Sequence, residues 1–251
     1  MPSEDDELVL VGHGPVATVY AGESDDTAFA LKIYPGEVDR RSLRSVRAEL
    51  ATLAELRDRA RILVADSVER RPGGTTALRM ELCAQSLSEL VEEAGRRPGD
   101  EAVALGEAPA ETLAAAHDRG IVHGGVSPGN VLFEGSGDAL LSDFGTTLRR
   151  HFSAESTPHG AVAPETLRDG VLDRRSDLYG LGATLYFALT GHAPHPRVPG
   201  EPDDRSVLRV LKDPAAPLDR PGVPPALADL VAQLLAKDPA DRPGSLTPLQ
   251  T

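Results

Sequence analysis

Hydrophobic and β-branched residues fall into short runs in the first third of the chain. Five such runs predict strands: residues 8–11, 16–20, 28–33, 62–68 and 75–82. Polar and glycine-containing segments at 23–26 and 70–74 separate two pairs of these runs in the way that hairpin turns do. The pattern therefore predicts a small antiparallel sheet for this part of the chain.

One segment within this region has a helical period instead. Between residues 38 and 59 the apolar positions recur every three or four residues, at Leu43, Val46, Leu50, Leu53 and Leu56. Four arginines mark the opposite side of this predicted helix: Arg40, Arg41, Arg44 and Arg47. They form either a solvated face or a surface that docks a partner.

After Cys83 the helical period dominates. Helices are predicted for residues 87–94, 101–118, 176–190 and 226–235. Pro109 lies inside the second of these helices, and because proline removes a backbone hydrogen bond, a kink or break is expected there. The proline-rich segment 192–224 is predicted to be a loop with one short helix.

The change of pattern at residues 83–86 predicts a boundary between two lobes of one α+β domain. That domain would span residues 1–251, with an N-lobe of residues 1–83 and a C-lobe of residues 84–251. The chain has 251 residues, of which 40% are hydrophobic, and this is enough to form a packed core.

Charge and composition narrow the functional classes. The net charge of −13, from 26 basic and 39 acidic residues, argues against a nucleic-acid or anionic-membrane binder. No run approaches 18 apolar residues, so no transmembrane helix is predicted. The first seven residues are acidic, unlike a signal peptide, and a cytoplasmic protein is expected. Cys83 is the only cysteine, which excludes a disulfide within the chain.

Five short motifs follow one another along the chain. They are residues 12–20 (GHGPVATVY), 29–32 (FALK), 123–130 (HGGVSPGN), 143–145 (DFG) and 163–165 (APE). Their order and spacing resemble the eukaryotic-like Ser/Thr protein kinases of bacteria over nearly the whole chain. The resemblance implies a two-lobed protein-kinase fold of the α+β class. A small antiparallel sheet and one helix would form the N-lobe, helices would form the C-lobe, and Mg-ATP would bind in the cleft.

The resemblance assigns the ATP contacts residue by residue. Gly12 and Gly14 belong to a loop whose backbone amides approach phosphates closely, although two glycines alone are equally typical of a hairpin turn. Lys32 would contact the α- and β-phosphates and pair with Glu49; either residue alone is also compatible with an ordinary surface charge. The other residues assigned to the nucleotide are Val19, Ala30, the gatekeeper Met80, the hinge residues Glu81 and Cys83, and Leu132.

Two residues are the expected Mg²⁺ ligands. Asp143 stands at the start of the DFG motif, and Asn130 ends the motif that begins at His123. Both offer the hard oxygen atoms that Mg²⁺ prefers. The expected cofactors are therefore ATP and Mg²⁺.

Other positions have structural roles by the same resemblance. Glu165 would pair with Arg242, and Asp177 would accept hydrogen bonds from the backbone around the catalytic loop. His123 would stack with Phe144 and Leu53 in the internal hydrophobic spine. His123 is thus interpreted as a structural histidine, in preference to an acid–base group or a ligand.

The motif that begins at His123 departs from the family where the chemistry is done. Gly125 stands where the catalytic Asp accepts the proton of the substrate hydroxyl. Gly124 replaces the Arg that binds a phosphorylated activation loop, and Ser127 replaces the Lys that steadies the γ-phosphate. No intact catalytic residue is expected in this loop.

Three functions are compatible with this pattern. The first is a pseudokinase that binds Mg-ATP and acts as a scaffold or allosteric regulator of an unknown protein partner. The second is a weakly active Ser/Thr kinase, or an enzyme that uses the same cleft for another transfer. The third is an interaction domain that binds no nucleotide.

Overall fold

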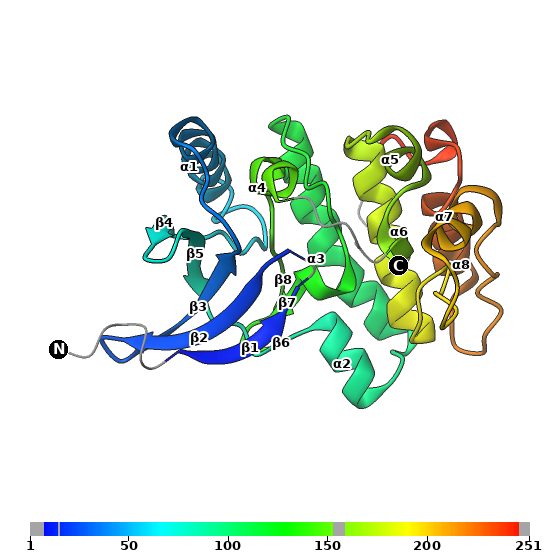
Figure 1. Cartoon of the computed structure of the whole chain (residues 1–251). Helices are drawn as coiled ribbons and strands as arrows, with labels where there is room; N and C mark the ends of the chain where they lie inside the picture. Colours follow the sequence, from blue (N-terminus) through cyan, green and yellow to red (C-terminus); the bar gives the residue numbers. More distant parts are fainter. Residues whose placement is uncertain (1–7, 15, 153–158, 246–251) are drawn as a thin grey trace.

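The computed structural model describes residues 8–14, 16–152 and 159–245 and has two lobes (Figure 1). The N-lobe contains one five-stranded antiparallel sheet in the order β1-β2-β3-β5-β4. Its strands are β1 (Val9–His13), β2 (Thr18–Ser24), β3 (Thr27–Tyr34), β4 (Ser67–Arg71) and β5 (Thr75–Glu81). The predicted antiparallel sheet is confirmed.

The turn between β2 and β3 shows how the local sequence sets the register. Asp25 and Asp26 have φ angles of 51° and 59°, the left-handed conformation that a two-residue hairpin turn requires. Ser24 then lies opposite Thr27, and the pairing continues to Thr18 opposite Ile33. This register fixes the face of the sheet on which each side chain of β3 lies.

The strand predicted for residues 62–68 is wrong in its first five residues. Residues 62–66 are not a strand, although Ile62 makes a single parallel bridge to Leu141, and β4 begins only at Ser67. The apolar side chains of this stretch are buried all the same, since Ile62 and Val64 belong to the main hydrophobic core. A buried apolar run does not by itself require strand geometry.

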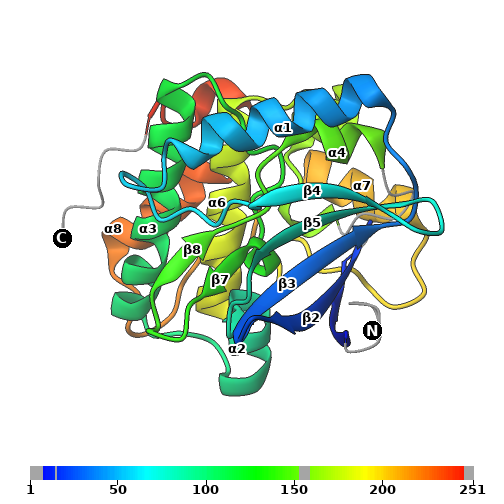
Figure 2. The ribbon, with the colours of Figure 1, turned by 90° about the vertical axis from the view of Figure 1, so that its left-hand side faces the viewer.

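The helix of the N-lobe, α1 (Arg40–Ala54), is shorter than predicted. Its N-terminus is capped by Asp39, whose side chain accepts hydrogen bonds from the amides of Arg41 and Ser42. Val46 and Leu53 face the core. The side chains of its four N-terminal arginines are exposed. Figure 2 shows α1 lying along the β4 side of the sheet.

The C-lobe is mainly helical. Its helices are α2 (Leu87–Ala94), α3 (Gly99–Asp118), α4 (Thr146–His151), α5 (Pro164–Asp169), α6 (Arg174–Thr190), α7 (Asp203–Lys212) and α8 (Pro225–Leu234). The short strands β6 (Gln85–Ser86), β7 (Val131–Phe133) and β8 (Ala139–Leu141) form a second sheet near the lobe junction. Helix α7 is the one short helix predicted within residues 192–224.

Helix α6 is the centre of this lobe, because 13 of its 17 residues are buried. Glycines permit its close contacts: a Cβ at Gly180 would lie 2.7 Å from the carbonyl oxygen of Val126, and one at Gly182 would lie 2.6 Å from the Cβ of Leu234. The segment around Val126 therefore packs directly on the α6 backbone.

The expected break at Pro109 does not occur. Helix α3 is continuous from Gly99 to Asp118, and Pro109 is one of its buried residues. A Cβ at Gly106 would lie only 2.7 Å from Leu185, so α3 and α6 are in close contact next to Pro109. Packing of this kind offsets the lost backbone hydrogen bond, which costs about 3 kcal/mol in an isolated helix.

Two further properties of the fold are the length of its apolar helices and the environment of Cys83. None of the helices in the described ranges is long and apolar enough to cross a membrane. Cys83 is half-buried, and its burial, with smaller contributions from Glu81 and Glu134, raises the pKa of the thiol to about 11. The thiol is therefore protonated at neutral pH and is a poor nucleophile.

Candidate nucleotide site at the lobe junction

Four residues assigned to the nucleotide lie on one face of the N-lobe sheet. Val19 is opposite Lys32 in the β2–β3 pairing, and Ala30 is opposite Met80 in the β3–β5 pairing. Side chains two residues apart on a strand share a face, so the register brings all four together. Glu81 ends β5, and Cys83 lies in the connection to β6.

The assigned glycines and Leu132 lie on other elements. Gly12 belongs to β1, and the amide of Gly14 donates to the carbonyl oxygen of Ala17 at 2.8 Å. Pro15, between them and the next strand, lies outside the described residues. Leu132 is in β7, where it pairs with Ser86 and Leu140.

Lys32 reaches across the junction to Asp143. The two side chains form an ion pair, and each is about one-fifth exposed. The expected pair between Lys32 and Glu49 is not present among the described residues. Glu49 instead accepts a hydrogen bond from the hydroxyl of Thr147 at 2.6 Å. The physical reason is α4, which packs against α1 and places this donor next to the Glu49 carboxylate.

Asp143 adopts an unusual backbone conformation. Its φ angle is 65°, in the left-handed region that non-glycine residues rarely adopt. The preceding residue, Ser142, is tied down by its amide and its hydroxyl, which donate to the carbonyl oxygen of Asn130 at 2.8 and 3.0 Å. The two expected metal ligands are thus fixed to each other through one serine.

Asn130 is oriented by the backbone of its own segment, residues 123–130. Its side-chain amide donates to the carbonyl oxygen of Gly125 at 2.8 Å. The other atom of that amide group, an oxygen, is the one that can contact a cation. No cluster of three or more His, Cys, Asp or Glu side chains that could bind a metal occurs within the described ranges. Asn130 and Asp143 both carry side-chain oxygen atoms, the kind of ligand that Mg²⁺ takes together with phosphate and water.

Asp177 holds the backbone at the start of residues 123–130, as expected. This carboxylate is 1% exposed and accepts hydrogen bonds from the amides of His123 and Gly124 at 2.8 and 2.7 Å. The imidazole Nε2 of His117 lies 2.8 Å from the same carboxylate. Gly124 has a φ angle of 73°, which the hydrogen bond to Asp177 stabilises.

His123 has the surroundings of a structural residue. It is fully buried, its ring centroid is 4.4 Å from that of Phe144, and its Nε2 lies 2.8 Å from the carbonyl oxygen of Ser142. Phe144 and Leu53 belong to the same buried cluster. Gly125 and Ser127 offer no carboxylate, and none stands between His123 and Asn130.

The family model of the protein kinase domain matches residues 6–251. The chain belongs to the protein kinase family. Serine/threonine-protein kinase PknL of Mycobacterium tuberculosis is 36% identical over 251 residues, which cover 92% of this chain and 60% of PknL. Serine/threonine-protein kinase PknK of the same species is 32% identical over 250 residues, covering 96% of this chain and 22% of PknK.

One further curated relative and one solved structure are also similar to this chain. The DNA damage-responsive serine/threonine-protein kinase RqkA of Deinococcus radiodurans is 33% identical over 255 residues, covering 95% of this chain and 37% of RqkA. A crystal structure of Rad53 1–466 in complex with AMP-PNP superposes with a TM-score of 0.75 at 24% identity, covering 94% of this chain and 61% of that one. The chain spans less than two-thirds of the length of each of these curated relatives.

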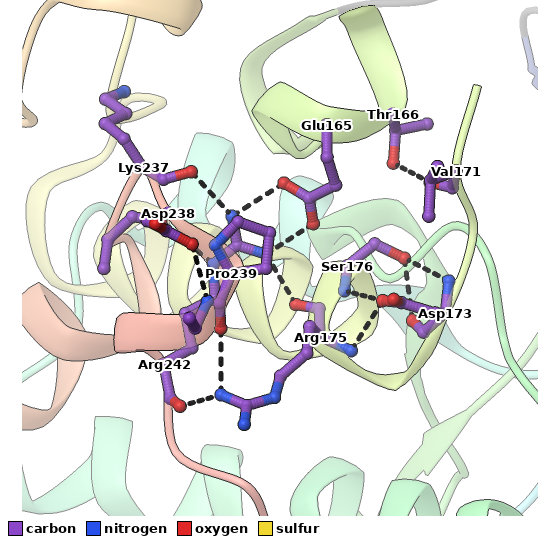
Figure 3. Close-up of polar contacts among 12 residues, drawn as sticks. Glu165, Thr166, Val171, Asp173, Arg175, Ser176, Lys237, Asp238, Pro239 and Arg242 are labelled. Carbon is purple, nitrogen blue, oxygen red and sulfur yellow. Dashed lines mark hydrogen bonds and ion pairs between the residues drawn. The ribbon is translucent and has the colours of Figure 1, made fainter. Parts of the chain in front are cut away.

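In the C-lobe, Glu165 and Arg242 form the expected ion pair, which joins separate segments of the kinase fold (Figure 3). The guanidinium donates to both carboxylate oxygens at 2.6 and 2.8 Å, and both side chains are at most 5% exposed. Arg242 also donates to the carbonyl oxygen of Arg175, and Arg175 in turn donates to those of Pro239 and Arg242. Three segments of the kinase domain meet at this network.

Sequence reasoning missed two residues that contact the candidate site, Thr147 and His117. Thr147 and the helix that carries it were not predicted, although Leu148 and Phe152 have the i, i+4 spacing of a helical face. His117 was also missed; its position in the last turn of a predicted helix gave no sign that it reaches Asp177. Both contacts depend on tertiary packing.

Proposed function

We propose that this kinase domain binds Mg-ATP and does not use it for efficient phosphoryl transfer, so that it acts as a pseudokinase. The observation that carries the proposal is a contrast within one site. Lys32, Asn130 and Asp143 lie together at the lobe junction, while position 125, where the family has its catalytic Asp, has no side chain.

The charges at the junction fit the nucleotide. Lys32 would contact the phosphates, and Asn130 and Asp143 would ligate Mg²⁺, which neutralises phosphate charge when bound. An ammonium and a carboxylate that pair with each other across the cleft are complementary to an anionic phosphate and a cation, respectively. Val19, Ala30 and Met80 on the sheet face above would contact the base.

The loss of transfer follows from what position 125 cannot do. A general base contributes about 10²- to 10⁴-fold to the rate. Ser127 replaces the cation that would balance the γ-phosphate, which adds to this loss. The proposed role is that of a nucleotide-dependent scaffold or allosteric partner, within one domain whose lobes meet near residues 83 and 84.

Titration calorimetry with Mg-AMP-PNP tests nucleotide binding. We expect saturable binding by the wild type and loss of binding in Lys32→Met. Lys212→Met is the matched control, because this lysine is exposed at the end of α7, and it should bind as the wild type does. Equal binding by all three proteins, or binding by none, would contradict the proposal.

A second candidate, a weakly active Ser/Thr kinase, is favoured by the names of the relatives PknL and PknK. Transfer of radiolabelled phosphate from ATP to the protein itself and to a generic substrate protein distinguishes the two. The pseudokinase proposal expects no transfer by the wild type. Robust transfer that Asp143→Asn abolishes would establish the kinase instead.

A further inference from the structure

Strand β1 is the last strand at one edge of the N-lobe sheet (Figure 1). It pairs with β2, and no other strand of the described residues pairs with it. The N–H and C=O groups along its outer side are therefore available to an additional strand. Val9–His13 contains no proline and no lysine, arginine, aspartate or glutamate, the residues that often prevent such pairing.

The apolar side chains of this strand are exposed. Val9, Leu10 and Val11 are 65%, 50% and 45% exposed, and they make up three of the six exposed large hydrophobic residues in the described ranges. Leu8 instead packs on the sheet, since a Cβ at Gly22 would lie 2.9 Å from it. Single exposed apolar residues are common, but three in a row along an unpaired strand are typical of an interaction site.

A bulge limits the length of this edge. Val11 has no opposite residue in β2, because the register shifts between Leu10 and Gly12. A strand bends at a bulge, so regular pairing with a further strand ends there. We call residues 8–11 the open edge.

Carboxylates gather at the start of the open edge. Because Val9 is opposite Ala21, the N-terminal end of β1 lies beside the β2–β3 turn, where Glu23, Asp25 and Asp26 are exposed. Four more acidic residues, at positions 4–7, precede the strand in the sequence, and the first 31 residues contain no lysine or arginine. An extended ligand on the open edge would therefore meet negative charge at one of its ends.

This charge favours a partner protein over a second copy of the chain. Antiparallel pairing of two β1 strands would place the carboxylates of each copy against residues 12–20 of the other, which contain no lysine or arginine. Each copy also carries a net charge of −13, so the two copies repel each other. A segment with lysine or arginine at one end complements the open edge better.

We propose that the open edge binds an extended segment of a partner protein by strand addition, and that this segment has alternating apolar residues followed by lysine or arginine. In antiparallel pairing the C-terminal end of the segment lies beside the N-terminal end of β1, so its basic residues meet the carboxylates there. Main-chain hydrogen bonds would supply affinity, and the charges would set the direction. The inference does not depend on nucleotide binding.

A fluorescein-labelled peptide of the sequence TVTVTVKRK tests the proposal by fluorescence anisotropy. We expect saturable binding that weakens as the salt concentration rises. The peptide KRKTVTVTV has the same composition with its charges at the other end, and it should bind roughly tenfold more weakly because its cations lie away from the carboxylates. Equal affinity of the two peptides would contradict the proposed direction and overturn the proposal.

Variants of the protein locate the binding site. Leu10→Lys removes an apolar contact and adds a charge of the same sign as the peptide, so it should abolish measurable binding. Leu208→Lys is the matched control, because Leu208 is 46% exposed in α7 of the other lobe, and it should bind as the wild type does. Equal effects of these two substitutions would overturn the proposal.

The carboxylates are tested in the same assay. Asparagine adopts the left-handed conformation as readily as aspartate, so Asp25→Asn with Asp26→Asn should keep the turn and weaken binding roughly fivefold. Glu92→Gln with Glu93→Gln removes two exposed carboxylates from α2 and should leave the affinity unchanged. Equal weakening in both double variants would show an effect of net charge alone, which contradicts the proposed site.

Methylated peptides test the main-chain contacts. N-methylation of the valine amides in TVTVTVKRK removes the donors along one side of the extended peptide, and N-methylation of the threonine amides removes those along the other. One of the two methylated peptides should bind as the parent does, and the other should lose binding. Equal affinity of both overturns strand addition.

Sedimentation velocity of the protein alone tests the competing occupant. We expect a monomer. A dimer that Leu10→Lys dissociates would mean that a second copy occupies the open edge, and it would overturn the proposal. Failure of TVTVTVKRK to bind with a Kd below about 1 mM also overturns it. Neither result bears on the binding of Mg-ATP, which calorimetry measures separately.

Discussion

Glu165 and Arg242 are opposite charges that the fold removes from water together. Taking such charges out of water costs several kcal/mol each, and the cost is offset only when geometry and additional hydrogen bonds are good. Here the pair is bidentate, and Arg242 makes further bonds to backbone carbonyl groups. Removing one partner would leave the other charged, buried and poorly satisfied.

We therefore expect Arg242→Met to destabilise the protein by about 3–5 kcal/mol, because Glu165 keeps its charge in a buried site. The free energy of unfolding in urea measures this. The exposed pair of Arg168 and Asp169 supplies the control: Asp169→Asn should change stability by less than about 1 kcal/mol. A similar loss of unfolding free energy in both variants would show that burial does not determine how much an ion pair contributes to stability.

At the scale of elements, Lys237 links α7 to a buried histidine of the C-lobe. His195 is 4% exposed, and its Nε2 lies 2.8 Å from the ammonium of Lys237, which also donates to the carbonyl oxygen of Val210 in α7. Burial, and then Lys237, lower the pKa of His195 to about 4; Asp213 raises it and Arg209 lowers it by less.

The resulting pH dependence has a definite sign. Below an ordinary pKa of about 6.5 the unfolded chain protonates this imidazole, and the folded protein does not until about pH 4. Stability is therefore lost as the pH falls, by about 1–2 kcal/mol between pH 7 and pH 5. Urea unfolding of His195→Leu at both pH values should show a loss of stability that is smaller than in the wild type by about 1–2 kcal/mol.

The neighbouring histidine is the control for this measurement. His192 is exposed, so His192→Leu should retain the pH dependence of the wild type. If the free energies of unfolding of His195→Leu and the wild type run parallel between pH 7 and pH 5, the buried imidazole is not the cause.

The elements also show where sequence reasoning succeeds. The hairpin of β2 and β3 was predictable because its turn residues and its apolar runs are local signals, and helix α2 was predicted with its observed bounds. Helix α4 was missed because six residues are too few to form a helix unless their apolar side chains are buried by other elements. Residues 62–66 were assigned to a strand because burial in the core looks the same in either geometry.

In the candidate site, too, some features were predictable from the sequence and others were not. The order of the motifs was enough to bring Lys32, Asn130 and Asp143 to one junction, since the fold determines those positions. The partner of Lys32 was predicted wrongly because it depends on where Thr147 lies, and no pattern within the sequence near Glu49 reports a residue 98 positions away. Fold-level positions are predictable, whereas the choice between two nearby partners is not.

At the scale of the whole molecule, the two lobes meet at the proposed nucleotide site (Figure 1). A ligand that contacts both lobes stabilises the folded molecule as a unit. At a concentration of 100 times its Kd, Mg-AMP-PNP should add about 2.7 kcal/mol. For a domain of this size that corresponds to a rise in Tm of roughly 5–10 °C.

Scanning calorimetry can check this prediction, and it suits a chain that has no tryptophan. The endotherm should move as one transition when Mg-AMP-PNP is added. Movement of only part of the endotherm would mean that the ligand contacts one lobe, and a Tm independent of nucleotide would contradict binding altogether.

The hydrogen bond from Asn130 to the carbonyl oxygen of Gly125 has a consequence for how such a protein can change over evolutionary time. The acceptor is a main-chain atom, which every amino acid supplies. Position 125 can therefore exchange its side chain while the amide that depends on it stays in place. Mutational drift at this one codon can change the side chain at position 125 without disturbing the side chain of Asn130, so the proposed loss of phosphoryl transfer and the proposed binding of Mg²⁺ can be inherited separately.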